Sequence, residues 1–147
     1  MMLSVTLLSL NCSVWAQERG TPEDAVAMVK KAVAYIQKHG QEKAFAAFAD
    51  LANSDFPDRE MYVYVNTMKG VTLISGVNPK LAGKDLIELK DADGIYINKI
   101  SIDLINTQGK GWVNYRWPNP VTKVIENKSS YIEKVGDIYI GCGIYRR

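Results

Sequence analysis

Aromatic side chains are concentrated in one short stretch of the sequence. Residues 111–120, GWVNYRWPNP, hold two tryptophans, a tyrosine and an arginine before two prolines. Trp and Tyr each combine a flat apolar body with one hydrogen-bond donor, so they fill cores and also wall small-molecule pockets. Alternation along a strand puts Tyr115 and Trp117 on one face of a sheet and Trp112 on the other. We expect Tyr115 and Trp117 to line a pocket, with core packing as the alternative, and Trp112 to pack in the core.

Two further segments supply candidate pocket residues. In MYVYVNT, residues 61–67, Tyr62 and Tyr64 share one face, and the apolar residues beside them share the other. Lys128 lies in the middle of a predicted strand, where a lysine is either exposed or paired with something negative. We expect Lys128 to contact an anionic ligand, and a solvated surface lysine is the alternative.

Motifs for other kinds of chemistry fail on inspection. DADG, residues 91–94, lacks the third oxygen residue and the later Glu of an EF-hand loop, because position 100 is Ile. The sequence has no phosphate-binding loop, no zinc-ligand spacing and no candidate catalytic triad. Cys142 has only His39 as a possible base, and nothing in the sequence links the two. We therefore expect no catalytic residues, no metal site and no cofactor.

Composition indicates one ordinary soluble domain. The chain has 147 residues, of which 47% are hydrophobic and 23% charged. Its net charge of +2, with basic and acidic residues interspersed, gives no reason to expect a nucleic-acid partner.

The first sixteen residues differ from the rest. MMLSVTLLSLNCSVWA is uncharged and mostly apolar, and it is too short to span a bilayer. Val14 and Ala16 fit a signal peptidase site, although the basic residues of a typical signal are missing. We expect residues 1–16 to be a signal peptide and residues 17–147 to be exported, to the periplasm or beyond. An N-terminal anchor, a buried apolar end and a lipid on Cys12 are the alternatives.

The order of predicted elements is helices first, then a mostly antiparallel sheet. Thr21 and Pro22 begin a helix that Gly40 ends, and apolar residues recur in it at three-and-four spacing. A second helix covers residues 41–51, and a third segment, residues 94–109, has Ile97, Ile100, Leu104 and Ile105 on one face. Strands are predicted at 61–67, 71–76, 111–117, 123–135 and 138–145. This order predicts an α+β layer architecture.

Several of these segments, in the same order, resemble one known family. They are AVAMVKKAVAYIQKHGQEKAFAAF, then MYVYVNTMKGVTLISGVNPKLAGKDLIELKDADG, and finally GWVNYRWPNP, NKSSYIEKV and IGCGIY. Together they resemble the single Cache domain family, extracytoplasmic relatives of PAS-like sensor domains. The match covers nearly everything after residue 24. Many members have His-Pro soon after the second strand, and here Ser75 and Gly76 stand in that place.

The resemblance implies a fold and a binding face. The fold is PAS-like, with a long N-terminal helix packed on a five-stranded antiparallel sheet. The ligand, often a short carboxylate in the family, is expected on the opposite face of the sheet, under the loops that follow the first hairpin. The expected ligand-binding residues, including the one that replaces the family histidine, are Tyr62, Tyr64, Ser75, Tyr115, Trp117 and Lys128.

The resulting functional prediction is a sensor rather than an enzyme. We expect a secreted or periplasmic module that binds a small, anionic molecule and takes part in signal transduction such as chemotaxis. The sequence shows no second membrane segment and no signalling domain, so a separate membrane receptor or sensor kinase would be the partner. The alternative is an interaction or scaffold protein whose pocket is vestigial.

Overall fold

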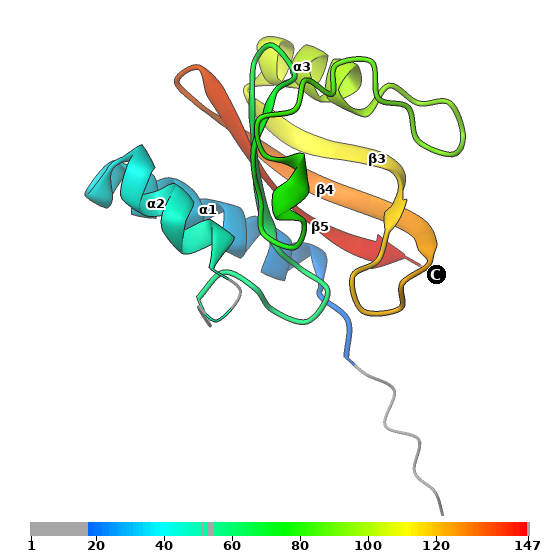
Figure 1. Ribbon diagram of the computed structural model, residues 1–147, viewed down its shortest axis with the longest axis horizontal. Helices are drawn as coiled ribbons and strands as arrows, with labels where there is room; N and C mark the ends of the chain where they lie inside the picture. Colours follow the sequence, from blue (N-terminus) through cyan, green and yellow to red (C-terminus); the bar gives the residue numbers. More distant parts are fainter. Residues whose placement is uncertain (1–17, 51, 53–54, 147) are drawn as a thin grey trace, which may run out of the picture.

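A single antiparallel sheet dominates the part of the chain that the computed structural model describes, residues 18–50, 52 and 55–146 (Figure 1). Its five strands lie in the order β2-β1-β5-β4-β3. The strands are β1 (Val63–Thr67), β2 (Thr72–Ser75), β3 (Lys110–Pro118), β4 (Ile125–Val135) and β5 (Ile138–Arg146). The predicted signal peptide, residues 1–16, lies outside the described residues.

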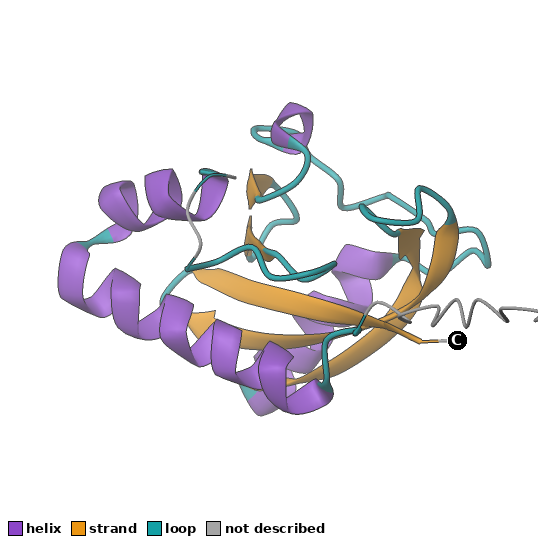
Figure 2. Cartoon of the chain, turned by 90° about the horizontal axis from the view of Figure 1, so that it is seen from below, coloured by secondary structure: helices purple, strands orange, loops and turns teal. Residues whose placement is uncertain are grey.

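Two helices cover one face of this sheet. The long helix α1 (Pro22–His39) runs lengthwise along the strands, and α2 (Gln41–Ala49) follows it after a turn (Figures 1 and 2). Thr21 begins α1 with a reciprocal capping box, in which its hydroxyl accepts from the Asp24 amide and the Asp24 carboxylate accepts from the Thr21 amide. Gly40 ends it at φ +82°, a backbone conformation that favours glycine.

The third helix, α3 (Ile97–Gln108), lies on the other face, against β3 and β4 (Figure 1). The connection from β2 to α3 contains one short 3₁₀ turn, Pro79–Leu81. The expected α+β, PAS-like arrangement of helices on a five-stranded antiparallel sheet is therefore confirmed.

The sheet separates two clusters of buried side chains. On the α1 side, Val63 and Val65 of β1, and Met61 just before it, pack with α1 and with alternate residues of β5, including Cys142. On the α3 side, Tyr139 packs with residues of α3, β3 and β4. The prediction that Cys142 is a buried small hydrophobe is confirmed, since its side chain is fully buried.

The prediction that Trp112 belongs to the core is wrong. Trp112 does face the α1 side, where it packs against Tyr131 across the strand pair at a ring distance of 5.6 Å. However, β3 is an edge strand of the sheet, and α1 packs mainly on β5 and β4. No helix among the described residues covers Trp112, and 37% of its surface is exposed.

Two smaller expectations also change. Ile100 was expected on the buried face of α3, but it is 37% exposed, and Ile97 and Ile105 make the buried contacts instead. β4 begins at Ile125 rather than at 123, because the Asn119 side chain accepts hydrogen bonds from the amides of Val121 and Thr122 and closes a turn there. In the described part of the chain, no helix is long and apolar enough to cross a membrane.

Candidate functional site

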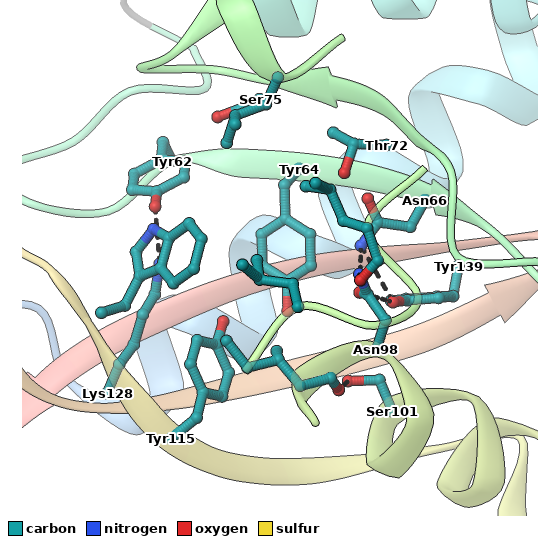
Figure 3. Close-up of a pocket in the computed structure, with 15 residues that line it drawn as sticks. Tyr62, Tyr64, Asn66, Thr72, Ser75, Asn98, Ser101, Tyr115, Lys128 and Tyr139 are labelled. Atoms are coloured by element: carbon teal, nitrogen blue, oxygen red, sulfur yellow. Dashed lines mark hydrogen bonds between the residues drawn. The ribbon is translucent and has the colours of Figure 1, made fainter. Parts of the chain in front are cut away.

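A cavity of about 50 Å³ lies on the face of the sheet opposite α1 (Figure 3). Its walls come from the sheet, from α3 and from the connection between β2 and α3. All six predicted site residues line it. The full lining is Tyr62, Tyr64, Asn66, Thr72, Ser75, Leu81, Leu86, Leu89, Ile97, Asn98, Ser101, Tyr115, Trp117, Lys128 and Tyr139.

The space above the sheet exists because two glycines lie beneath it. Gly141 and Gly143 of β5 point to the cavity side, alternating with the buried Cys142. A Cβ atom at Gly141 would come within 2.1 Å of the Tyr64 ring, and one at Gly143 within 2.3 Å of Lys128 Cε. The Tyr64 ring and the Lys128 stem can therefore lie flat against the sheet only because both positions lack a side chain.

An irregularity between β1 and β2 gives the cavity two hydroxyl groups. Tyr64 pairs with Ser75 and Val65 with Ile74, but Asn66 pairs with Thr72, so one extra residue of β2 is left opposite β1. At this bulge the side chains of β2 no longer alternate strictly between the two faces of the sheet. Thr72 and Ser75, three residues apart, consequently face the same cavity.

Lys128 is buried at one end of the cavity among aromatic rings. The residue is 2% exposed, and its Nζ donates a 2.9 Å hydrogen bond to Tyr62 Oη. The same nitrogen lies 4.1 Å from the centroid of the Tyr62 ring, 5.8 Å from that of Tyr64 and 5.1 Å from that of Tyr145. These contacts hold an ammonium by cation–π attraction but supply no negative charge.

The Lys128 ammonium has no negatively charged partner among the described residues. Among the described residues it forms no ion pair, and the cavity lining contains no Asp or Glu. Removal from water lowers the pKa of the Lys128 ammonium below its ordinary value. Buried charges in proteins are normally paired, and no residue of the cavity lining supplies a counter-charge to Lys128.

Tyr62 and Tyr64 are neutral donors and acceptors in the cavity. Burial raises the pKa of Tyr62 to about 12 and that of Tyr64 well above its ordinary value. Tyr115 Oη and Ser130 Oγ, both buried, form a 2.8 Å hydrogen bond. The Tyr115 ring also meets Trp117 edge to face, at 6.2 Å between centroids. These side chains form a wall that is apolar in body and polar at its tips.

The opposite end of the cavity is held by an amide network. Asn98 Nδ2 donates to the Leu86 carbonyl at 2.8 Å, which ties α3 to the β2–α3 connection. Asn98 Oδ1 accepts from Tyr139 Oη at 2.8 Å and from Asn66 Nδ2 at 3.2 Å. Asn66 Nδ2 also donates to Tyr139 Oη at 2.9 Å. Two strands, β1 and β5, are thus joined to α3 and to the β2–α3 connection at one point.

The thiol of Cys142 is not part of the cavity. Cys142 lies on the far side of the sheet beside Met28 Sδ, 3.5 Å away, and burial raises the pKa of its thiol to about 12. Within the described residues, no three His, Cys, Asp or Glu side chains gather in a way that could hold a metal ion. What the cavity offers is one buried cation, several hydroxyl groups and an amide network.

The sequence did not predict nine of the fifteen residues that line the cavity. Asn66, Asn98, Ser101 and Tyr139 were not expected there, nor were the leucines of the β2–α3 connection. One signal was available: in IYIGCGIY the residues that alternate with the isoleucines and Cys142 are Tyr, Gly, Gly and Tyr. Two glycines between two tyrosines on one face of a strand indicate that this part of the sheet forms the bottom of a cavity, with an aromatic side chain at each end.

Comparison with known proteins agrees with this geometry. Residues 23–147 match the family model described as "Cache domain". The methyl-accepting chemotaxis protein McpP of Pseudomonas putida is 34% identical over 90 residues, which make up 60% of this chain and 16% of McpP. The chain therefore matches only a small part of that relative's length.

Two solved structures share the fold. A Cache chemosensory domain described for its recognition of carboxylic acids superposes with a TM-score of 0.75 at 25% identity, over 85% of this chain and 92% of that one. The periplasmic sensor domain of a chemotaxis protein superposes with a TM-score of 0.67 at 23% identity, over 85% and 90% of the two chains.

Proposed function

The chain belongs to the Cache domain family, and from that premise we propose that it is an extracytoplasmic sensor module that binds a short carboxylate. The ligand carboxylate lies against Lys128, with Tyr62 and Tyr115 as hydrogen-bonding neighbours. The module has no catalytic role in this proposal. Signalling passes to a membrane receptor or sensor kinase, as the similarity to a chemotaxis receptor suggests.

One observation carries the proposal: the buried Lys128 has no anionic partner among the described residues. A carboxylate would supply the missing charge and would accept charge-assisted hydrogen bonds from the ammonium and a tyrosine hydroxyl. The structural relative described for carboxylic acid recognition supports the same ligand class.

The size of the cavity favours a small acid. At roughly 10–15 Å³ for each water-sized group, about 50 Å³ holds about four such groups. That is the size of a monocarboxylate with a short carbon chain. The leucines and aromatic rings of the wall suit its apolar part.

The decisive test replaces Lys128 with methionine. Lys128→Met keeps the length of the side chain and removes the charge, so affinity for acetate or propionate should fall by about 1.5–3 kcal/mol, the range for a hydrogen bond to a charged group. Stability should hold or rise, because a buried unpaired charge is replaced by an apolar side chain. Calorimetric titration measures the affinity, and thermal unfolding without ligand measures the stability.

Lys134→Met is the matched control, since Lys134 lies on the same strand but is exposed. It should bind as the parent does. In the parent, ligand at a hundred times Kd should add about 2.7 kcal/mol to the free energy of unfolding. A parent protein that gains no stability from any short carboxylate would favour the scaffold alternative, with a vestigial pocket.

A further inference from the structure

One hydrogen-bond acceptor in the cavity is not used by the protein. Asn66 lines the cavity and is 6% exposed, and its Oδ1 is buried without a hydrogen-bond partner among the described residues. Buried polar atoms almost always have a partner, so an exception in a pocket points to a group that arrives with the ligand. Figure 3 shows Asn66 at the end of the cavity opposite Lys128, with Tyr64 between them.

The orientation of the Asn66 amide follows from its neighbours. The Leu86 carbonyl can only accept, so the Asn98 group that faces it at 2.8 Å must be Nδ2. Asn98 Oδ1 then faces Asn66 and Tyr139 and requires donors from both. The Asn66 group turned toward Asn98 must therefore be Nδ2, and Oδ1 is the atom left over (Figure 3).

We propose that Asn66 is a specificity-determining residue that accepts a hydrogen bond from a hydroxyl group of the ligand, so that the site prefers a hydroxycarboxylate to the unsubstituted acid. The inference rests on the proposed function, because it places the ligand carboxylate at Lys128. The Thr72 hydroxyl faces the same part of the cavity, across the β1–β2 pair from Asn66, and can receive or donate a second hydrogen bond.

A hydroxyl fits this end of the cavity better than an ammonium group. The cavity already holds the Lys128 ammonium, and its lining contains no Asp or Glu. A second buried cation would therefore lack a counter-charge, whereas a neutral hydroxyl needs only the acceptor that Asn66 provides. The same argument ranks amino acids below hydroxy acids of equal length.

The test compares acids that differ in one group. The probes are propionate, 2-hydroxypropionate, 3-hydroxypropionate and 3-aminopropionate, titrated into the wild-type protein and into Asn66→Leu and Asn66→Asp. One hydroxypropionate should bind wild type about 3- to 10-fold more tightly than propionate, the worth of one neutral hydrogen bond. In Asn66→Leu this ratio should fall to about one.

Asn66→Asp keeps the shape of the side chain and adds a charge. Its carboxylate can pair with an ammonium group, so the preference between 3-aminopropionate and 3-hydroxypropionate should move at least about 10-fold toward the amine. If Asn66→Leu does not fold, the titrations of Asn66→Asp still test whether Asn66 determines the specificity.

The outcomes separate the two proposals. If propionate binds wild type as tightly as both hydroxy acids, or if 3-aminopropionate binds it best, the role of Asn66 is overturned while carboxylate binding stands. A hydroxyl preference that survives in Asn66→Leu would overturn it as well. If none of the four acids binds wild type, the proposed function fails and the inference fails with it.

Discussion

A lysine whose charge is buried without a carboxylate is a costly residue for a small domain to keep. Lys128 is held by ring faces and by one hydroxyl, and its pKa is lowered by removal from water. An anion at the site would favour the protonated amine and so raise that pKa again. Ligand binding and protonation of Lys128 are therefore linked.

This linkage predicts the direction of a pH dependence. The bound form holds its proton more tightly than the free form, so Kd should be constant at low pH and should increase as pH rises through the pKa of Lys128 in the free protein. With one proton involved, the increase is at most about tenfold per pH unit. Calorimetric titration with propionate at several pH values between about 6 and 10 measures this change in Kd.

Lys128→Arg serves as the control, because a guanidinium stays charged throughout this range. If this variant retains binding, its Kd should not change with pH. The three tyrosines around the Lys128 ammonium titrate above this range, since burial raises the pKa of Tyr62 to about 12 and raises those of Tyr64 and Tyr145 as well. A parent protein whose Kd is flat up to pH 10 would contradict the linkage between ligand binding and the lowered pKa of Lys128.

Alternate residues of strand β5 face the core under α1 and the cavity on the other side of the sheet. Its isoleucines and Cys142 pack under α1, while Gly141 and Gly143 form the cavity floor between Tyr139 and Tyr145. Substitutions at neighbouring positions of this one strand should therefore have different consequences for stability and for binding.

Gly143→Ala and Cys142→Ser test this division. The new Cβ at 143 would meet the flexible Lys128 chain and Ser130 Oγ, so we expect weaker binding of propionate, by up to about 1.5–3 kcal/mol, and a stability cost of about 1 kcal/mol. Cys142→Ser buries a hydroxyl on the core side and should cost about 1–3 kcal/mol of stability with binding retained. Denaturant unfolding and calorimetry together give both quantities, and equal effects on binding in the two variants would contradict the division.

Strand alternation explains what the sequence could predict, and the pairing of strands explains what it could not. Tyr62, Tyr64, Tyr115 and Trp117 were placed correctly because their facing depends only on position along one strand. The shared facing of Thr72 and Ser75 depends on a bulge between two strands, which no local pattern indicates. Trp112 was misplaced because its burial depends on the order of strands across the sheet.

Across the part of the chain that the structure describes, the two faces of the sheet are covered differently. Helix α1 and its cluster cover one face with fully buried side chains. On the other face, the segment 77–96 closes the cavity with Leu81, Leu86 and Leu89, yet none of its residues is fully buried. Its hydrogen bonds to the rest of the chain include one from the Leu86 amide to the Gly70 carbonyl and one from the Arg116 amide to Asp91 Oδ2.

This contrast predicts where a ligand will change the motion of the chain. Segments with few buried contacts open locally at little cost in free energy, so amides of 77–96 should exchange rapidly with solvent in the free protein. A ligand in the cavity contacts the leucines of this segment and should slow their exchange. Helix α2 lies on the opposite face of the sheet from the cavity. The ligand should therefore leave the exchange of its amides unchanged at exchange times too brief for global unfolding. Hydrogen–deuterium exchange with and without propionate measures both regions, and equal slowing of α2 and 77–96 would mean that the sheet transmits the effect rather than confining it.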